Sequence, residues 1–391
     1  MKKIKVAFFA EILIEDHDGA TRTMFQLLKR IPEASFEFLF ICGSGPDKVA
    51  GFECMKIPSV TLPVNRNYTM SLPLLALPKM IGKLKEFKPD VIHIATPSPL
   101  GQYAIQYAQA HRLPVISIYH THFISYVDYY LKHLPFLIDC VKSKILISMK
   151  TFYNQCDQVY IPSESIAAEL MAMGIHVNRM KIWKRGIDAG LFSPLKKNAR
   201  VMREITGNGH PTVLFASRLV WEKNLETLFR IYDRLQISNP EYNFVIAGDG
   251  AAGGFCKTRM LKAHCFGTAD HEKLSVLYAS ADVFVFTSVS ESYGNVVLEA
   301  MASGLPCVIA NGGGSKDFIE QGINGFACEP NNEKDYIGKI NLLLQNKNLW
   351  NQFSEEGRKY SLHFDWNELA NTYFNDVAFL SHKYEAKISL S

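Results

Sequence analysis

Residues 283–310, VFVFTSVSESYGNVVLEAMASGLPCVIA, set the organisation of this chain. Two short apolar runs, 283–286 and 307–310, flank a stretch in which a glycine-containing turn at Gly294 opens a helix. Continuous apolar strands separated by a helix are typical of a parallel sheet that is covered on both faces. The stretch therefore predicts one strand–helix–strand unit of such a sheet.

The same alternation runs from end to end and forms two series of strands. The apolar runs are KVAFFA, FEFLFIC, DVIHIA, PVISIY and QVYIPS, followed by TVLFAS, NFVIAG, DVFVFTS and PCVIAN. A charged stretch with Gly, Pro and Asn, residues 183–211, joins the two series as a linker would.

We therefore predict an α/β protein with two doubly wound, Rossmann-like parallel-sheet domains that face a central cleft. The domains comprise residues 1–188 and 189–364, and ligands bind at the carboxyl ends of the strands. The tail, 365–391, has helical apolar spacing and is expected to cross back and pack on the first domain.

Composition fits a soluble globular protein: 391 residues, 48% apolar and 20% charged. No apolar run approaches the ~18 residues of a membrane span. The opening lysines and VAFFA mimic a signal peptide, but Glu11 interrupts the run, so we interpret residues 5–10 as a buried strand. The eight cysteines are scattered without a C-x-x-C pair, which favours a reducing cytoplasm.

Positive charge is concentrated in the first half of the chain. Residues 1–188 hold 22 Lys and Arg against 16 Asp and Glu, a balance of +6, and the remainder balances at −2. Nucleic acid, an anionic membrane surface and ordinary surface variation are the three interpretations. The stretches 67–88 and 134–153 mix leucines, methionines and lysines, as interfacial segments or ordinary amphipathic helices do. We expect peripheral contact with the inner face of the cell membrane and no nucleic acid.

Two carboxylates, Glu291 and Glu299, lie eight residues apart around Gly294 and Asn295. The start of a helix presents free N–H groups and the positive end of its dipole, which suits a diphosphate. A carboxylate on each side accepts hydrogen bonds from neutral hydroxyls, such as those of a sugar and a ribose. This layout predicts a nucleotide-sugar.

Arg218 and Lys223 follow the strand TVLFAS and lie five residues apart. Breaking a glycosyl–phosphate bond builds negative charge on the departing diphosphate, which preorganised cations stabilise. The alternative is a solvated basic face. Together with the two glutamates, the pair is interpreted as functional.

These residues resemble retaining glycosyltransferase family 4, which has the two-domain GT-B fold. The matching pieces are ASRLVWEKNLETL, VIAGDG, YASADVFVFTSVSESYGNVVLEAMASGLPCVIANGGG and INGF, in family order. In the first half, PDVIHIATPSPLG, ISIYHTHFISYVDYY, CDQVYIPS and IWKRGIDAGLFSP resemble the branch of lipid-directed mannosyl- and sulfoquinovosyltransferases.

The resemblance implies that residues 1–188 bind the acceptor and that residues 189–364 bind the nucleotide-sugar. It also implies a role for each residue of the motif. Glu299 would hold the ribose, Glu291 would lie beside the transferred hexose, and Arg218 and Lys223 would grip the diphosphate. The backbone amides that face the sugar and its phosphate would come from Tyr293, Gly294, Asn295 and Val296.

His120, in YHTHF, would touch the donor hexose near the reacting carbon, and we prefer it to His122 because it matches the family position. Tyr126 and Tyr130 either line the acceptor site or belong to the core. The first loop has Gly19 and Ala20 where the family usually has a glycine pair, so a backbone contact to the donor phosphate is expected there. Arg185, Gly186 and Asp188 either hold the inter-domain segment or reach the diphosphate.

Residues 248–253 form a literal G-x-G-x-x-G, with Asp270 downstream. NAD or FAD binding is the alternative interpretation, but the fingerprint belongs after the first strand of its unit and this one follows the second. We expect Gly248 and Gly250 to shape the loop beside the nucleotide base.

We expect neither a metal nor a cofactor, because Arg218, Lys223 and the helix dipole would take the place of a cation at the diphosphate. The predicted function is retaining transfer of a hexose from a GDP-mannose or UDP-glucose type donor to a lipid or glycan-lipid acceptor. Front-face attack and double displacement through Glu291 are both open. The competing functions are a nucleotide-sugar epimerase, a phosphorylase and a non-catalytic two-domain ligand-binding protein.

Overall fold

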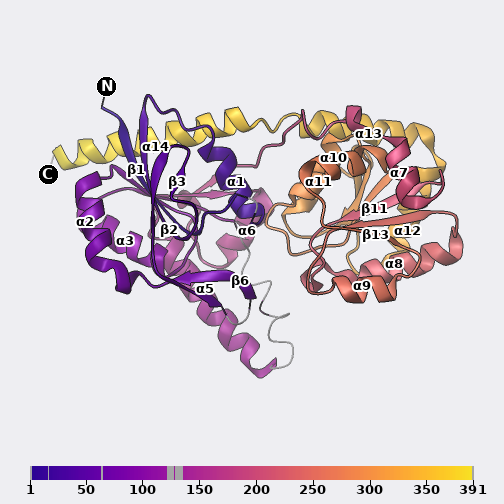
Figure 1. Ribbon diagram of the computed structural model, residues 1–391, viewed down its shortest axis with the longest axis horizontal. Coiled ribbons are helices and arrows are strands. Elements are labelled where there is room, and N and C mark those ends of the chain that lie inside the picture. The colour runs from indigo at the N-terminus through magenta and orange to yellow at the C-terminus, as the bar shows by residue number, and fades with distance from the viewer. Residues whose placement is uncertain (1, 16, 63–64, 121–126, 128–134, 390–391) are drawn as a thin grey trace. The chain divides into compact units, whose positions relative to one another are not determined.

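The computed structural model describes residues 2–15, 17–62, 65–120, 127 and 135–389, which divide into two compact units (Figure 1). Unit 1 comprises Met1–Arg185 and Trp366–Ser391, and unit 2 comprises Gly186–Asp365. This division lies close to the predicted boundary at residue 188. Each unit is built on a parallel sheet with helices on its faces, so the predicted α/β class is confirmed.

Unit 1 contains an eight-stranded sheet in the order β10-β9-β8-β7-β1-β2-β4-β3. All neighbours in it are parallel except β3 and β4. Its strands are β1 (Ile4–Ile12), β2 (Phe36–Ser44), β3 (Lys48–Val49), β4 (Phe52–Lys56), β7 (Val91–Ile94), β8 (Val115–Ile118), β9 (Gln158–Ile161) and β10 (Met180–Ile182).

A separate antiparallel hairpin, β5 (Ser59–Leu62) and β6 (Asn65–Ser71), belongs to the same unit. The sequence stretch 67–88 therefore begins as a strand and becomes helical only from residue 73 onward. The helices of the unit are α1 (Gly19–Leu28), α2 (Leu77–Phe87), α3 (Pro99–His111), α5 (Ile138–Tyr153), α6 (Glu164–Ala172) and α14 (Trp366–Ser389), with 3₁₀ turns η1 (Pro73–Ala76), η2 (Pro135–Leu137) and η3 (Val177–Arg179).

Strand β1 shows how this sheet is covered on both faces. Val6 and Phe8 belong to a core shared with α1 and α14, whereas Ala7 and Phe9 belong to a core shared with α2, α3, α5 and α6. Side chains alternate between the two faces of a strand, and both faces of β1 are covered by helices. The strand therefore needs apolar residues at consecutive positions, as in the run KVAFFA.

The C-terminal helix α14 packs on unit 1 although it follows unit 2 in sequence (Figure 1). The Asp376 carboxylate accepts hydrogen bonds from the Tyr160 hydroxyl at 2.6 Å and the Gln158 amide at 2.9 Å, and pairs with Lys181 at 2.6 Å. Tyr373 lies in the core and shares a 2.9 Å hydrogen bond with the His93 ring. Among the helices of the described residues, none is both long and apolar enough to cross a bilayer.

Unit 2 contains a six-stranded, wholly parallel sheet in the order β13-β12-β11-β14-β15-β16. Its strands are β11 (Thr212–Ala216), β12 (Asn243–Ala247), β13 (His264–Gly267), β14 (Val283–Phe286), β15 (Cys307–Ala310) and β16 (Gly325–Cys328). Its helices are α7 (Ala199–Thr206), α8 (Leu225–Ser238), α9 (Gly253–Arg259), α10 (His271–Ser280), α11 (Asn295–Ala302), α12 (Glu333–Gln345) and α13 (Lys347–Ser361), with 3₁₀ turns η4 (Pro194–Lys196), η5 (Trp221–Lys223) and η6 (Gly314–Phe318).

Every residue of β11, β12, β14 and β15 is buried. Strand β14 is central, with β11 on one side and β15 on the other. The loops that follow these three strands therefore leave the sheet at one edge, where parallel sheets bind ligands.

Candidate functional site

Lys223 and Glu291 form an ion pair at the carboxyl edge of the unit 2 sheet. Lys223 ends the η5 turn after β11, and Glu291 lies in the loop after the neighbouring β14. The Lys223 ammonium donates to the Glu291 carboxylate, and the two side chains are only 6% and 17% exposed. The structure thus brings together two predicted site residues that lie 68 positions apart.

Two opposing effects act on the ionisation of Glu291. Burial raises the pKa of its carboxyl, but the charge and hydrogen bond of Lys223, a hydrogen bond from Ser288 and the charge of Arg218 lower it. The net result is a pKa below the ordinary value. Glu291 is therefore an anion at neutral pH and accepts, rather than donates, hydrogen bonds.

Buried hydroxyls hold the turn that carries Lys223. Thr287 donates through Oγ1 to the carbonyl of Lys223 at 2.9 Å, and Ser290 donates through Oγ to the carbonyl of Glu222 at 2.8 Å. These two hydroxyls tie η5 to the loop after β14, so the ammonium and the carboxylate are positioned by a common frame. Neither residue was predicted from the sequence, although their place between β14 and Glu291 was a usable signal.

Three consecutive glycines, 312–314, pack against the backbone of the Glu291 loop. The N–H of Gly314 donates to the carbonyl of Glu291 at 2.7 Å. Gly313 has a φ of +59°, and a Cβ there would lie 2.9 Å from the Glu291 nitrogen and 2.8 Å from its carbonyl oxygen. Only glycine permits this approach, which fixes the backbone of Glu291.

Helix α11 begins at Asn295, directly after Gly294, so its first-turn N–H groups lie next to the Glu291 loop. Gly294 has a φ of +91°, and a Cβ there would lie 2.5 Å from the Cβ of Ser315. As a glycine it also supplies no side-chain cap. The amides that were predicted to face a phosphate are therefore those of an α-helix N-terminus.

Glu299 lies further along α11 and is 8% exposed. The Tyr278 hydroxyl donates to its Oε2 atom at 3.3 Å, which orients the carboxylate. Tyr278 is a third site residue that was not predicted from the sequence, because it lies 21 positions upstream on α10. Tyr293 is buried against Phe318 with 4.8 Å between the ring centroids, so its side chain serves the core.

Gly248 and Gly250 support the loop that carries Arg218. A Cβ on Gly248, whose φ is +137°, would lie 1.8 Å from the carbonyl oxygen of Ser217, and one on Gly250 would lie 2.6 Å from that of Leu219. The Leu219 N–H donates to the Asp249 carbonyl at 2.9 Å. The glycines are thus required by close backbone packing beside exposed Arg218, and their expected contact with a nucleotide base stays a prediction.

The other predicted donor contacts belong to unit 1. His120 follows β8 and is buried, and burial, with the charges of Arg185 and His93, holds its pKa well below the ordinary value. Arg185 donates to its carbonyl at 3.4 Å. A neutral imidazole results, and its expected place beside the donor hexose stays a prediction. His122, Tyr126 and Tyr130 lie outside the described residues.

Gly19 and Ala20 open α1, whose N-cap is Asp18. The Asp18 side chain accepts hydrogen bonds from the N–H groups of Ala20 at 3.0 Å and Thr21 at 2.9 Å. The Ala20 amide that was expected to meet the donor phosphate is therefore capped by a carboxylate in this structure.

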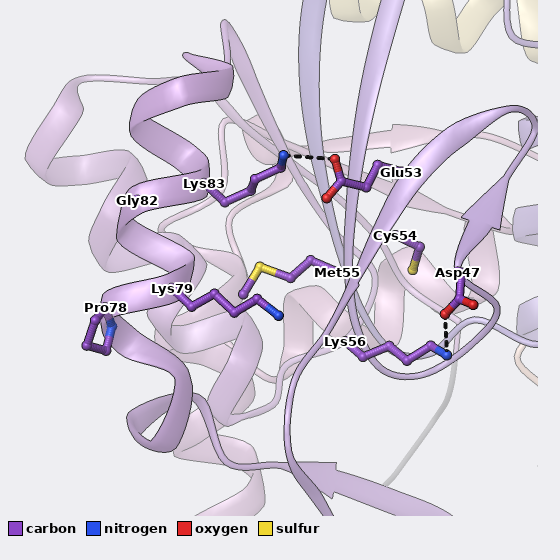
Figure 2. Close-up of a pocket in the computed structure, with 9 residues that line it drawn as sticks. All are labelled: Asp47, Glu53, Cys54, Met55, Lys56, Pro78, Lys79, Gly82 and Lys83. Atoms are coloured by element: carbon purple, nitrogen blue, oxygen red, sulfur yellow. Dashed lines mark ion pairs between the residues drawn. The ribbon is translucent and has the colours of Figure 1, made fainter.

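A hollow of about 500 Å³ lies elsewhere on unit 1, between β4 and α2 (Figure 2). Lys56 pairs with Asp47 at 2.6 Å and Lys83 pairs with Glu53 at 2.8 Å, so most of the charge in its lining is neutralised. It contains none of the predicted donor residues. Within the described ranges, no group of three or more His, Cys, Asp and Glu side chains is arranged to hold a metal.

The ion pair predicts a pH-dependent stability. In the folded protein the pKa of Glu291 lies below its ordinary value of 4.5. The ion pair therefore stabilises the fold fully above pH 4.5, and this stabilisation is lost as the pH falls through the pKa that Glu291 has in the folded protein. We expect Lys223→Met to lower the free energy of unfolding by about 3 kcal/mol at neutral pH. We expect Lys223→Met/Glu291→Leu to recover most of it. In urea unfolding, a difference between wild type and Lys223→Met that stays constant down to low pH would contradict the pairing.

The close approach at Gly248 predicts that a side chain at this position lowers the stability of the fold. Gly248→Ala places a methyl group against the Ser217 carbonyl, so we expect thermal unfolding to show a loss of about 3 kcal/mol or more. Gly254→Ala is the matched control, because a Cβ there meets nothing within 4 Å and its backbone is helical. Equal stability of the two variants would show that the packing is looser than described.

Comparison of the sequence with known proteins identifies the family of this chain. The model described as Glycosyltransferase Family 4 matches residues 17–191, and the one described as Glycosyl transferases group 1 matches residues 201–360. The sulfoquinovosyl transferase SQD2 of Arabidopsis thaliana is 31% identical over 82% of this chain, and the match spans 62% of that protein's length. A GDP-mannose-dependent alpha-mannosyltransferase of Corynebacterium glutamicum is 30% identical over 84% of this chain and 78% of its own.

Solved structures agree on the fold. A sucrose-phosphate synthase from Thermosynechococcus elongatus superposes with a TM-score of 0.77 at 19% identity, with all of both chains covered. Anabaena HepE in complex with UDP and glucose gives 0.73 at 18% identity, covering 96% of this chain and 99% of its own. Since the sequence matches extend across both units and one of them spans most of both chains, this protein belongs to glycosyltransferase family 4.

Proposed function

We propose that the protein is a retaining glycosyltransferase that moves a hexose from a nucleoside-diphosphate sugar to an acceptor hydroxyl. The observation that carries this proposal is the buried Lys223–Glu291 pair, which lies beside the N-terminus of α11 and is followed along that helix by Glu299. A cation, amides and two carboxylates at one sheet edge match the diphosphate and the two rings of such a donor.

Relatives that transfer mannosyl or glucosyl groups make donors of the GDP-mannose and UDP-glucose types the two candidates. The bacterial relatives include GDP-mannose-dependent alpha-mannosyltransferases and, in Streptococcus pneumoniae, an alpha-monoglucosyldiacylglycerol synthase that is 28% identical over 60% of this chain and 54% of its own. In this chain Glu299, oriented by Tyr278, would accept hydrogen bonds from the ribose. Glu291, which is anionic, would accept hydrogen bonds from the hydroxyls of the hexose.

Charge stabilisation of the leaving group is the main catalytic effect in this proposal. As the bond between the anomeric carbon and the phosphate oxygen breaks, its electron pair passes to the diphosphate. Lys223 is already charged and held by its ion pair and its clamped turn, so it needs little reorganisation to meet that charge. Arg218 and the N–H groups at the start of α11 would also stabilise the negative charge on the diphosphate.

Front-face attack fits these residues better than double displacement. The acceptor oxygen would bond to the anomeric carbon on the face that the phosphate leaves, and the departing phosphate oxygen would take the acceptor proton. A double displacement would need Glu291 as the nucleophile, yet its carboxylate is bound to the Lys223 ammonium and its pKa is lowered, both of which weaken a nucleophile. His120 would lie near the reacting carbon, as the family resemblance implies.

The test is transfer from radiolabelled GDP-mannose and UDP-glucose to lipid extracts. We expect Glu291→Ala and Glu299→Ala each to lower the rate by about 100-fold or more, because each removes hydrogen bonds made in the transition state. Glu272→Ala, at an exposed ion pair with Lys196, serves as the control. Near-normal rates in both site variants would overturn the assignment, and an altered nucleotide-sugar without a glycoside would identify an epimerase.

We also infer that the acceptor is a lipid or glycan-lipid, met at the inner face of the cell membrane. Leu74 and Leu75 of η1 are 78% and 69% exposed, and they directly precede the lysine-bearing helix α2. Exposed leucines beside lysines favour contact with an anionic bilayer.

Flotation with vesicles that contain phosphatidylglycerol tests this membrane contact at low salt. We expect wild type to float and Leu74→Glu/Leu75→Glu to remain in the dense fractions, since the added carboxylates are repelled by the lipid headgroups. Leu195→Glu, at a position in unit 2 that is 94% exposed, should float as wild type does. Failure of wild type to bind would contradict the membrane proposal and leave the transferase proposal standing.

A further inference from the structure

The hollow between β4 and α2 in unit 1 contains no residue of the candidate donor site (Figure 2). Its volume of about 500 Å³ is that of a site for a small organic ligand. Lys79, Gly82 and Lys83 line it from the helix, where spacings of three and four residues place side chains on one face. Met55 lines it from the strand. Two elements of the fold therefore form a space that a ligand can enter.

Gly82 lies within α2 at a position where the fold does not require glycine. It is exposed, its backbone is helical, and a Cβ there would meet nothing within 4 Å. Glycine inside a helix costs about 1 kcal/mol relative to alanine. Since neither a left-handed backbone nor close packing calls for glycine, the structural effect of the missing side chain is to keep the hollow open.

The lining carries three ammonium groups and two carboxylates. Lys56 pairs with Asp47 at 2.6 Å and Lys83 pairs with Glu53 at 2.8 Å, whereas Lys79 forms no ion pair with the described residues. Figure 2 shows Lys79 and Lys83 reaching from α2 toward β4. One positive charge in the lining is therefore left for an anionic ligand.

The two ion pairs also leave hydrogen-bond acceptors within reach of a ligand. They use Oδ1 of Asp47 and Oε2 of Glu53, whose side chains are 90% and 58% exposed. The second oxygen of each carboxylate can accept hydrogen bonds from neutral hydroxyls. Exposed pairs of this kind contribute only about 0–1 kcal/mol, so they yield readily to a ligand. The hollow thus offers a cation for an anion and carboxylates for hydroxyl groups.

We propose that this hollow binds a phosphate ester that carries free hydroxyl groups. Lys79 contacts the phosphate as a compact positive charge, and Asp47 and Glu53 accept hydrogen bonds from the hydroxyls. A soluble polyol phosphate and the phosphoglycerol headgroup of a lipid share this chemistry. The site goes beyond the proposed function, because it belongs to unit 1 and shares no residue with the donor site of unit 2.

Binding is measured by NMR on the full chain with ¹³C-methyl-labelled methionine, and the Met55 methyl group is the reporter. Met55→Leu identifies its signal by removing it. The first probe is sn-glycerol 3-phosphate, titrated at constant ionic strength. We expect a saturable shift of the Met55 signal in wild type. In Lys79→Met we expect the affinity to fall by about tenfold, because a charge-assisted contact is lost.

Gly82→Leu fills the hollow without changing its charges. We expect it to weaken binding at least tenfold and to keep or raise the melting temperature, because leucine forms helices better than glycine. Gly338→Leu is the matched control and should bind the probe as wild type does. Gly338 is an exposed glycine of α12 in unit 2, and a Cβ there also meets nothing within 4 Å. Loss of binding with an unchanged melting temperature therefore reports the filled hollow and not unfolding.

Dihexanoyl phosphatidylglycerol, kept below its micelle concentration, gives the lipid arm of the same titration. A lipid source predicts that it binds at least tenfold more tightly than glycerol 3-phosphate, because its chains can contact exposed Leu74 and Leu75. A soluble source predicts the reverse order. The inference is overturned if neither ester gives a saturable shift, if Gly82→Leu binds as wild type does, or if inorganic phosphate or glycerol alone binds as tightly as the esters.

Discussion

The ion pair between Lys223 and Glu291 is the interaction on which the candidate site of unit 2 depends. Each charge alone would be expensive to bury, and each is stabilised because the other is present. The adjacency of β11 and β14 makes the meeting possible, and hydroxyl groups from the β14 loop hold the turn that carries the lysine. The charges are thus fixed before any ligand arrives, which is what electrostatic catalysis requires.

Backbone packing between loops provides the second constraint. Gly248 lies against Ser217, Gly313 against Glu291, and Gly294 against Ser315, each so closely that a Cβ would collide with its neighbour. These contacts join the loops at the carboxyl edge into one rigid frame. A frame of this kind loses little entropy when it binds an anion, so its amides and cations remain aimed at the place where charge develops.

The two units share a way of presenting a carboxylate. In unit 2, Glu299 has one oxygen oriented by the Tyr278 hydroxyl, and in unit 1, Glu11 has one oxygen oriented by Ser71. In both units, a hydroxyl from a different element anchors an acidic side chain at or near the carboxyl edge of a parallel sheet. Such anchoring gives a flexible side chain one direction.

Patterns among near neighbours in the sequence were enough to predict the two series of buried strands, the helix opening at Gly294 and the residue types of the candidate site. Strand order and loop packing decided the rest: that Lys223 meets Glu291 across 68 positions, that Ser71 meets Glu11 across 60, and that Gly248 serves the Arg218 loop. The hairpin β5–β6 also escaped prediction, since its strands lack a long apolar run. Periodicity reports which face of an element is buried, but only the folded sheet decides which loops become neighbours.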